Sequence, residues 1–283
     1  MSPLLAALAA LSAAHAGPVF VGTEVARSLL DAGAVVLDAR GPRSWAQGHL
    51  PGSAPVDWKD HRASWGREGR LTPDTATLGS TLGAIGVSDA RTVLVIGGGR
   101  EGWGEEGRIF WMLDHLGHPD VRIIDGGWPR WVEAGLPVTR DSTRPAPGTF
   151  TPKVRPDTRA DTEAVAAGLE SGVVFWDTRE AREYAGETPY REARGGHLPG
   201  AHHLWFKDLL TEQGTLKNRG ELRALLAARG IPLDAPVIAY CTGGVRSGFA
   251  YAVLRELGAP SPANYDGSMW EWAADGSRPL ALP

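Results

Sequence analysis

The sequence predicts an α/β fold with two tandem domains, each a parallel sheet covered by helices on both faces. Length is the first indication, because 283 residues suit two domains of ordinary size better than one. The second is a series of short, fully apolar runs between helical patterns, which is typical of strands buried in a helix-covered parallel sheet. The third is an internal duplication that spans most of the chain.

Four sequence blocks return in the second half of the chain in the same order. The pairs are Val35–Arg40 with Val173–Arg179, Gly48–Ser53 with Gly196–Ala201, Val93–Ile96 with Val237–Tyr240, and Asp125–Trp128 with Asp266–Met269. We interpret them as two copies of one domain, at residues 17–140 and 159–283. Residues 141–158 hold four prolines among polar residues and are interpreted as the linker.

Each copy is expected to alternate strands with helices. In the first copy the patterns predict strands at 35–38, 54–56, 93–96 and 121–124, and helices at 23–31, 74–85, 105–116 and 128–134. In the second copy they predict strands at 173–177, 202–204, 237–240 and 263–265, and helices at 161–170, 219–229, 247–257 and 268–273. In such folds ligands bind beyond the carboxyl ends of the strands.

Composition narrows the classes of function. A net charge of −4 gives no general attraction to nucleic acid or to an anionic membrane, so neither is expected as a partner. The chain has one cysteine, Cys241, which excludes an internal disulfide and a cysteine-based metal cluster.

Cys241 follows the apolar run Val237–Tyr240 and precedes two glycines and a helical pattern. The glycines allow the backbone to curl so that successive N–H groups point inward, and the helix adds the positive end of its dipole. Together these features are expected to lower the thiol pKa and to hold an anion above the sulfur. The alternative is a buried structural cysteine, which would not need glycines and an arginine behind it.

The motifs together resemble those of the rhodanese family, the thiosulfate and 3-mercaptopyruvate sulfurtransferases. The resemblance covers about residues 20–280 and consists of Asp-x-Arg after a strand and Gly-His-Leu-Pro-Gly in both copies, Cys-x-x-Gly-x-Arg-Ser at 241–247, and the segment Tyr265–Trp272. It implies that only the second domain carries a catalytic cysteine. In agreement, Gly97 stands in the first copy where Cys241 stands in the second, so the first domain is expected to be inactive and to line the cleft.

The resemblance implies sulfur transfer through a persulfide on Cys241, without a metal or an organic cofactor. A small-molecule donor such as thiosulfate gives its outer sulfur to Cys241, and cyanide, a thiol or a sulfur-acceptor protein then takes it. The substrate-binding residues expected around the sulfur are Thr242, Gly243, Gly244, Val245, Arg246 and Ser247.

Two other readings of the loop stay open. Cysteine phosphatases and arsenate reductases resemble Cys-x5-Arg, a loop that wraps a tetrahedral oxyanion, whereas Arg246 follows Cys241 after four residues. The shorter loop favours a persulfide sulfur over a phosphate. The second alternative is that the chain is a non-catalytic sulfur-binding or sulfur-carrier module.

The identity of the donor rests on two departures from the mercaptopyruvate enzymes. Those enzymes resemble Cys-Gly-Ser-Gly-Val-Thr and carry a substrate-binding arginine six residues after the aspartate of Asp-x-Arg. Here these places hold Gly243 and Glu183, which favours thiosulfate over 3-mercaptopyruvate. The cationic pattern of the animal thiosulfate enzymes is also missing at Thr242 and Gly243.

Other polar and aromatic residues receive mainly structural interpretations. The second copy is longer between Asp177 and His197, and Arg194 in that insertion is expected to bind an anion. His49 and His197 occur in both copies, including the one without a nucleophile, and are therefore expected to hold turns. Four tryptophans are expected to pack against the sheets or between the domains: Trp128, Trp131, Trp270 and Trp272.

The N-terminus predicts export. Leu4–Ala14 is an apolar run too short to span a bilayer, and Ala14-His15-Ala16 precedes Gly17 as a signal-peptidase site would. We therefore expect residues 1–16 to be a signal peptide and the protein to be periplasmic or exported. The absence of Lys and Arg from residues 1–3 favours the alternative, a short helix of a cytoplasmic protein.

Overall fold

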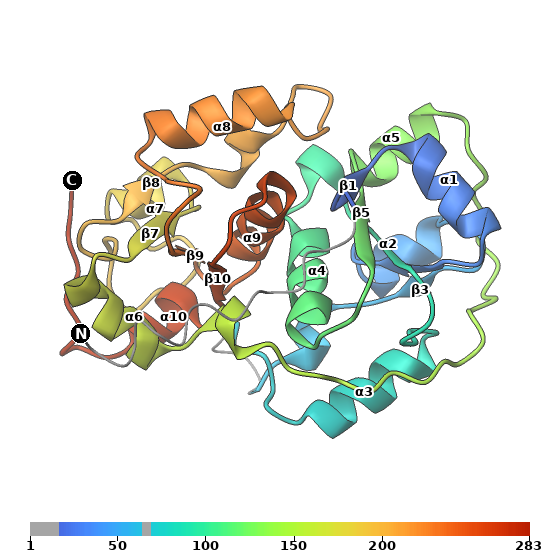
Figure 1. The fold of residues 1–283 in the computed structure, drawn as a ribbon, viewed down its shortest axis with the longest axis horizontal. Coiled ribbons are helices and arrows are strands. Elements are labelled where there is room, and N and C mark those ends of the chain that lie inside the picture. Colours follow the sequence, from blue (N-terminus) through green and yellow to red (C-terminus); the bar gives the residue numbers. More distant parts are fainter. Residues whose placement is uncertain (1–16, 64–68) are drawn as a thin grey trace.

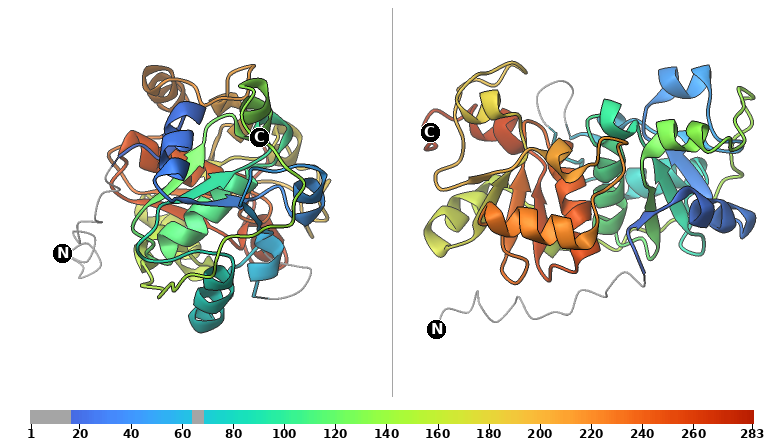
Figure 2. Two further views of the ribbon diagram at one scale, coloured as in Figure 1. Left: turned by 90° about the vertical axis from the view of Figure 1, so that its right-hand side faces the viewer. Right: turned by 90° about the horizontal axis from the view of Figure 1, so that it is seen from above.

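The protein consists of two lobes side by side, seen in a computed structural model that describes residues 17–63 and 69–283 (Figures 1 and 2). Each lobe is built on a five-stranded sheet whose neighbouring strands are all parallel. The strand order is β1-β5-β4-β2-β3 in the first lobe and β6-β10-β9-β7-β8 in the second, so the two sheets have the same topology. The predicted α/β fold with two copies of one domain is confirmed.

The strands are short, and the central ones are buried. Their bounds are β1 (Phe20–Val21), β2 (Val35–Asp38), β3 (Ala54–Pro55), β4 (Val93–Ile96) and β5 (Val121–Ile124), then β6 (Arg159–Ala160), β7 (Val174–Asp177), β8 (His202–His203), β9 (Val237–Tyr240) and β10 (Pro262–Tyr265). Every residue of the central strands β4 and β9 is buried. This burial on both faces is what the fully apolar sequence runs predicted.

The helices lie within about two residues of the predicted bounds where they were predicted. They are α1 (Thr23–Asp31), α2 (Pro42–Gln47), α3 (Thr75–Ala84), α4 (Glu105–His115), α5 (Gly127–Glu133), α6 (Thr162–Ser171), α7 (Ala181–Tyr184), α8 (Arg219–Ala228), α9 (Arg246–Leu257) and α10 (Ser268–Trp272). The sequence patterns missed four short elements, β1, β6, α2 and α7.

The duplicated Asp-x-Arg and Gly-His motifs fix one turn in each domain. Arg40 pairs with Asp38 and donates to the Gly48 carbonyl at 2.8 Å, and Arg179 does the same with Asp177 and the Gly196 carbonyl at 2.8 Å. The adjoining histidine rings bond backbone carbonyls at 2.8 Å (His49) and 2.9 Å (His197). The predicted structural role of both histidines is confirmed.

Helices α4 and α9 form the centre of the domain interface (Figure 1). They cross at a pair of equivalent glycines: a Cβ on Gly107 would lie 2.2 Å from Phe249 Cα, and one on Gly248 would lie 2.8 Å from Arg108 Cα. Glycine at both positions lets the two backbones approach closely, because the Cβ of any other residue would clash with the opposite helix. The interface is thus nearly symmetric about the crossing point.

Reciprocal hydrogen bonds extend this symmetry to the carboxyl edges of the sheets. The Asp125 carboxylate accepts from the Leu216 N–H at 2.7 Å, and the Asp266 carboxylate accepts from the Leu71 N–H at 2.6 Å. Each bond ties a loop of one domain to the ligand-binding edge of the other. The second domain's site is therefore built partly from the first domain.

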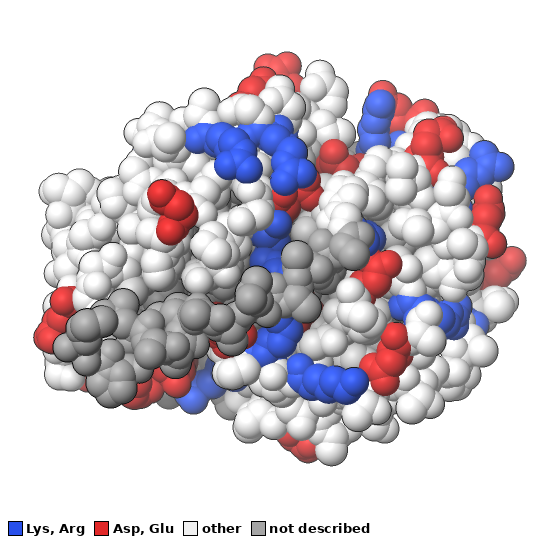
Figure 3. Space-filling view, in the orientation of Figure 1, with Lys and Arg blue, Asp and Glu red and all other residues white. Residues whose placement is uncertain are grey.

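The surface carries both signs of charge. Lys and Arg are interspersed with Asp and Glu over the face shown in Figure 3, in keeping with the small net charge of −4. Among the described residues, no helix combines the length and apolar character needed to cross a membrane. The proposed signal peptide, residues 1–16, lies outside the described residues.

Candidate active site

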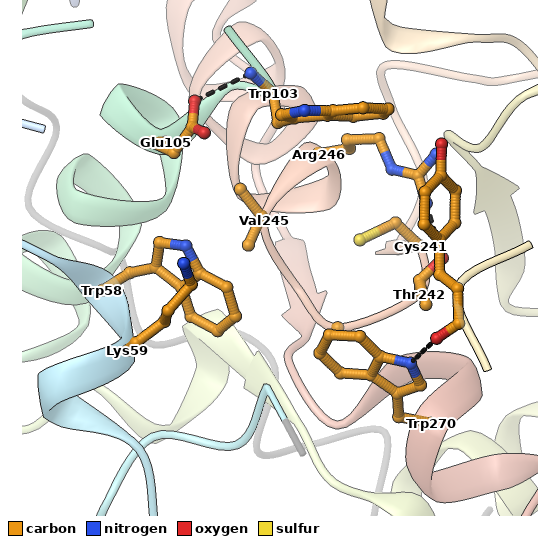
Figure 4. Close-up of a pocket in the computed structure, with 11 residues that line it drawn as sticks. Trp58, Lys59, Trp103, Glu105, Cys241, Thr242, Val245, Arg246 and Trp270 are labelled. Atoms are coloured by element: carbon orange, nitrogen blue, oxygen red, sulfur yellow. Dashed lines mark hydrogen bonds between the residues drawn. The ribbon is translucent and has the colours of Figure 1, made fainter. Parts of the chain in front are cut away.

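Cys241 lies at the carboxyl end of the central strand β9, and its side chain points into a cavity of about 350 Å³ (Figure 4). The residue is 1% exposed, and it is one of the residues that line that cavity. Both domains supply walls. The lining residues are Trp58, Lys59, Trp103, Glu105, Tyr190, Cys241, Thr242, Gly243, Val245, Arg246 and Trp270.

The loop after β9 directs hydrogen-bond donors at the sulfur. The Gly244 N–H donates to Cys241 Sγ at 3.1 Å, and the Ser247 hydroxyl donates to it at 3.6 Å. Gly244 has φ +77°, the left-handed conformation that turns the loop inward and that favours glycine. On its other side Cys241 is anchored by its own N–H, which donates to the Ser268 hydroxyl at 3.0 Å. The predicted curl of the loop around the sulfur is present.

The surroundings lower the pKa of the Cys241 thiol below its ordinary value. Burial is the largest influence and opposes ionisation, but the charge of Arg246 and the donors of Ser247 and Gly243 outweigh it. The N-terminus of α9, which begins at Arg246, faces the sulfur and adds to the effect. The sequence-based expectation of an activated thiol therefore agrees with the geometry.

Arg246 is held by a buried carboxylate. Its guanidinium makes a two-point contact with Glu183 at 2.5 and 2.8 Å, and it also donates to the Thr242 hydroxyl at 2.5 Å. Thr242 in turn donates to Glu183 at 2.7 Å. Glu183 thus partly neutralises the only cation of the loop, which makes the pocket less attractive to an anion than the loop sequence alone suggests.

Aromatic rings form most of the wall facing the sulfur. Trp103 and Tyr190 meet edge to face at 5.6 Å, and the Arg246 guanidinium lies 5.6 and 5.4 Å from their ring centres. The Trp270 indole N–H donates to the Tyr190 carbonyl at 2.9 Å (Figure 4). Trp270 packs against the core of the first domain, in agreement with its expected place between the domains, and it also lines the cavity. Trp131 and Trp272 are buried as expected.

Arg194 is not among the side chains that line the cavity, which corrects its expected role as an anion-binding residue. Its guanidinium donates to the backbone carbonyls of Ala273 at 3.0 Å, Arg278 at 2.9 Å and Asp275. These carbonyls end and follow α10, where a cation is favourable. The same insertion does reach the site, but through Tyr190 and through Glu192, which accepts from Thr242 at 3.3 Å.

In the first domain a carboxyl group fills the place of the thiol. Gly97 follows β4 as Cys241 follows β9, and a Cβ on Gly97 would lie 2.0 Å from Glu106 Oε2. Glu106 is buried, and Oε2 has no hydrogen-bond partner among the described residues. Burial, with a smaller contribution from Glu105, raises the pKa of Glu106 to about 8. The side chain is therefore a neutral filler at pH 7, and Gly97 has no room for a nucleophile.

Sequence reasoning missed the residues that the first domain contributes to the pocket, Trp58, Lys59, Trp103 and Glu105. One signal was available for two of them. The loop from Gly97 to Arg108 is longer than its counterpart after Cys241, and this longer loop carries Trp103 and Glu105. Nothing in the sequence indicates that Trp58 and Lys59 face the second domain's thiol.

The model of the rhodanese-like domain matches residues 23–134 and again residues 161–275. The chain belongs to the rhodanese family. This rhodanese is similar to the thiosulfate sulfurtransferase of Pseudomonas aeruginosa, with 31% identity over 88% of this chain and 91% of the relative. It is also similar to the sulfur carrier protein TtuD of Thermus thermophilus, with 32% identity over 80% of this chain and 82% of the relative. Thiosulfate sulfurtransferase of Bos taurus is 31% identical over 81% of this chain and 79% of the relative.

Solved structures agree with the rhodanese fold. A structure of EanB in complex with ergothioneine superposes with a TM-score of 0.84 over 93% of this chain and 70% of the other, at 22% identity. The crystal structure of YnjE gives a TM-score of 0.79 at 23% identity, over 93% of this chain and 68% of the other. At these identities the likeness concerns the fold alone.

Proposed function

We propose that the protein is a sulfurtransferase that moves sulfane sulfur from thiosulfate to a thiophilic acceptor through a persulfide on Cys241. The observation that carries the proposal is the pair of donors at Cys241 Sγ, from Gly244 at 3.1 Å and Ser247 at 3.6 Å, at the bottom of a cavity. Support also comes from relatives that are named thiosulfate sulfurtransferases.

The first half-reaction loads the enzyme. The Cys241 thiolate attacks the outer sulfur of thiosulfate, a new S–S bond forms, and the original S–S bond breaks with its electron pair leaving on sulfite. The outer sulfur of the resulting persulfide carries the negative charge that the thiolate had. Donors of the loop stabilise that charge in the way an oxyanion hole does. The lowered thiol pKa increases the fraction of Cys241 that is thiolate at a given pH.

The second half-reaction unloads it. A nucleophilic acceptor attacks the outer sulfur, the bond between the two sulfurs breaks, and its electron pair returns to Cys241 as the thiolate. Cyanide would leave as thiocyanate, and a thiolate of a small molecule or of an acceptor protein would leave as its persulfide. Both halves conserve charge and electrons without a metal or an organic cofactor.

Intact mass measurement after incubation with thiosulfate tests the proposal. We expect a gain of one sulfur in the wild type, reversal by cyanide with release of thiocyanate, and no gain in Cys241→Ser. Parallel incubation with 3-mercaptopyruvate identifies the donor, since thiosulfate is expected to load the enzyme faster. No gain with either donor, together with turnover of an aryl phosphate, would overturn sulfur transfer in favour of a cysteine phosphatase. A protein that gains sulfur but never yields thiocyanate or an acceptor persulfide would be a carrier.

We further propose that the protein is exported, on the basis of the Leu4–Ala14 run and Ala14-His15-Ala16. The natural protein is then expected to begin at Gly17. N-terminal sequencing of the protein purified from its own cells measures this, and a start at Met1 or Ser2 would rule out removal of a signal peptide.

A further inference from the structure

One buried cation of the inactive domain reaches the active-site loop of the other domain. Arg108, in α4, is 1% exposed, and its guanidinium donates to the Gly244 carbonyl at 3.3 Å and to the Gly69 carbonyl. It also lies 4.0 Å from the Asp266 carboxylate and 4.5 Å from the centre of the Trp111 ring. A buried guanidinium needs such partners to offset the loss of hydration.

The Gly244 carbonyl that Arg108 holds is part of the loop that surrounds the sulfur. Gly244 donates its own N–H to Cys241 Sγ, so the orientation of the peptides on either side of Gly244 sets the direction of that donor. A second donor, the Asn264 side-chain amide, reaches the same carbonyl at 3.2 Å. The contact is tight, because a Cβ on Gly244 would lie 2.5 Å from Arg108 Nη1.

The duplication provides an internal comparison. Arg108 follows Gly107 as Phe249 follows Gly248, and these glycines are equivalent at the crossing of α4 and α9. The inactive domain's loop therefore receives a phenyl ring from its partner: a Cβ on Gly104 would lie 2.9 Å from Phe249 Cβ. At this pair of equivalent positions, the loop that carries the thiol receives a guanidinium and the other loop receives a phenyl ring. The asymmetry between the two interface positions follows the asymmetry between Cys241 and Gly97.

We propose that Arg108 is a positioning residue for sulfur transfer: by holding the Gly244 carbonyl across the domain interface, it keeps the loop's N–H donors aligned on Cys241 Sγ and on the outer sulfur of the persulfide. The part of the proposal that concerns the persulfide rests on the proposed function. The part that concerns the Cys241 thiol rests on the geometry alone. It gives the first domain a defined part in the chemistry of the second. Arg108 stays charged near neutral pH, since burial lowers its pKa only to about 10.

Two measurements on each variant test the proposal. The rate of alkylation of Cys241 by iodoacetamide as a function of pH reports the thiol pKa and needs no sulfur donor. The rate of sulfur loading from thiosulfate, followed by intact mass, reports the half-reaction. In Arg108→Met we expect a higher thiol pKa and a loading rate constant about tenfold lower, with a smaller change in the thiosulfate concentration at half-maximal rate.

A matched control is Arg100→Met. Arg100 also donates across the domain interface, to the Thr211 carbonyl at 3.2 Å, but to a segment other than the Cys241 loop. We expect Arg100→Met to leave both measurements within about twofold of the wild type, because the contact does not touch the loop around the sulfur. If Arg100→Met changes both as much as Arg108→Met does, the effect belongs to the interface in general and the proposal is overturned.

Arg108→Lys separates the effect of the positive charge from that of the fixed guanidinium donors. It also replaces Arg108→Met as the test variant if Arg108→Met does not fold. A lysine keeps the charge but cannot present two fixed donors, so we expect loading to remain at least about threefold below the wild type. Full recovery in the lysine variant would leave charge alone as the cause. A folded Arg108→Met protein with the wild-type alkylation profile, or one that loses loading without a change in that profile, would also overturn the proposal. Failure of the wild type to load sulfur refutes the proposed function instead and leaves the alkylation comparison valid.

Discussion

Replacing Glu183 by glutamine is expected to strengthen the attraction of the site for thiosulfate while weakening the fold. Glu183 is fully buried and pairs with Arg246 at 2.5 and 2.8 Å, so it screens the charge that lowers the Cys241 pKa. Without the carboxylate, the guanidinium acts on the thiolate and on a dianionic donor with less compensation. We expect a lower thiol pKa and a KM for thiosulfate about three- to tenfold lower.

The same substitution leaves a buried guanidinium without its counter-ion. Breaking a buried ion pair from one side costs about 3 kcal/mol, although the glutamine oxygen can still accept one hydrogen bond. We therefore expect the free energy of unfolding in urea to fall by about 2–3 kcal/mol. Steady-state kinetics with thiosulfate and urea titration measure the two effects on one protein sample.

Glu192→Gln is the control for Glu183→Gln. Glu192 is a second buried carboxylate beside Thr242, and it accepts a hydrogen bond from the Thr242 hydroxyl at 3.3 Å. Among the described contacts, Glu192 makes no ion pair with Arg246. Its replacement is expected to change KM for thiosulfate by less than about twofold. A higher KM in Glu183→Gln than in the wild type would show that Glu183 matters mainly by orienting Arg246, and would contradict the screening argument.

Replacing Glu106 by glutamine is expected to stabilise the protein increasingly as the pH rises. Burial raises the pKa of Glu106 to about 8, whereas its ordinary value is 4.5. Between these values the unfolded chain releases the proton and the folded chain retains it, so stability falls as the pH rises through this window. Glutamine has a similar shape and no charge to lose. We expect a gain near zero at pH 4.5 that grows to about 4 kcal/mol at pH 8.

Two effects oppose each other when Glu106 ionises, and their sizes decide whether ionisation stabilises or destabilises the folded protein. An acidic side chain in the first turn of α4 gains up to about 1 kcal/mol from the helix dipole when it is charged. Desolvation of a buried carboxylate without a partner at Oε2 costs several times more, on the order of a few kcal/mol. Urea titrations of wild type and Glu106→Gln at pH 5, 6, 7 and 8 measure the difference. Glu101→Gln, an exposed neighbour, should show no such trend, and a flat difference for Glu106→Gln would mean that Glu106 is ionised in the folded state.

The local parts of the fold and of the site could be predicted because short stretches of sequence determine them. The strand Val237–Tyr240, the two glycines and the helix after them place Cys241 at a carboxyl edge and curl the loop around it, whatever lies elsewhere. The Asp-x-Arg and Gly-His motifs hold their turns through contacts within one domain. Repetition of these motifs established two domains, and Gly97 indicated which of them lacks the thiol.

Contacts between distant segments were beyond prediction. Arg246 meets Glu183 across 63 positions of sequence, and this pairing partly neutralises the positive charge of the loop. Arg194 and Tyr190 lie in the same insertion, but only the folded path of that insertion turns Tyr190 toward the thiol and Arg194 toward the end of α10. Side-chain direction in an irregular segment depends on what packs beside it, and no sequence period encodes that.

The sequence by itself therefore determined the α/β fold, its duplication and the loop that carries Cys241 as its thiol. Only the tertiary structure decided what surrounds that thiol: the aromatic wall, the partner of Arg246 and the contact of Arg108 with Gly244. The physical reason is that the fold, its duplication and the Cys241 loop follow from backbone preferences and hydrophobic period over a few residues. The surroundings of the thiol depend on how two similar domains pack at Gly107 and Gly248, which places side chains from both domains around Cys241.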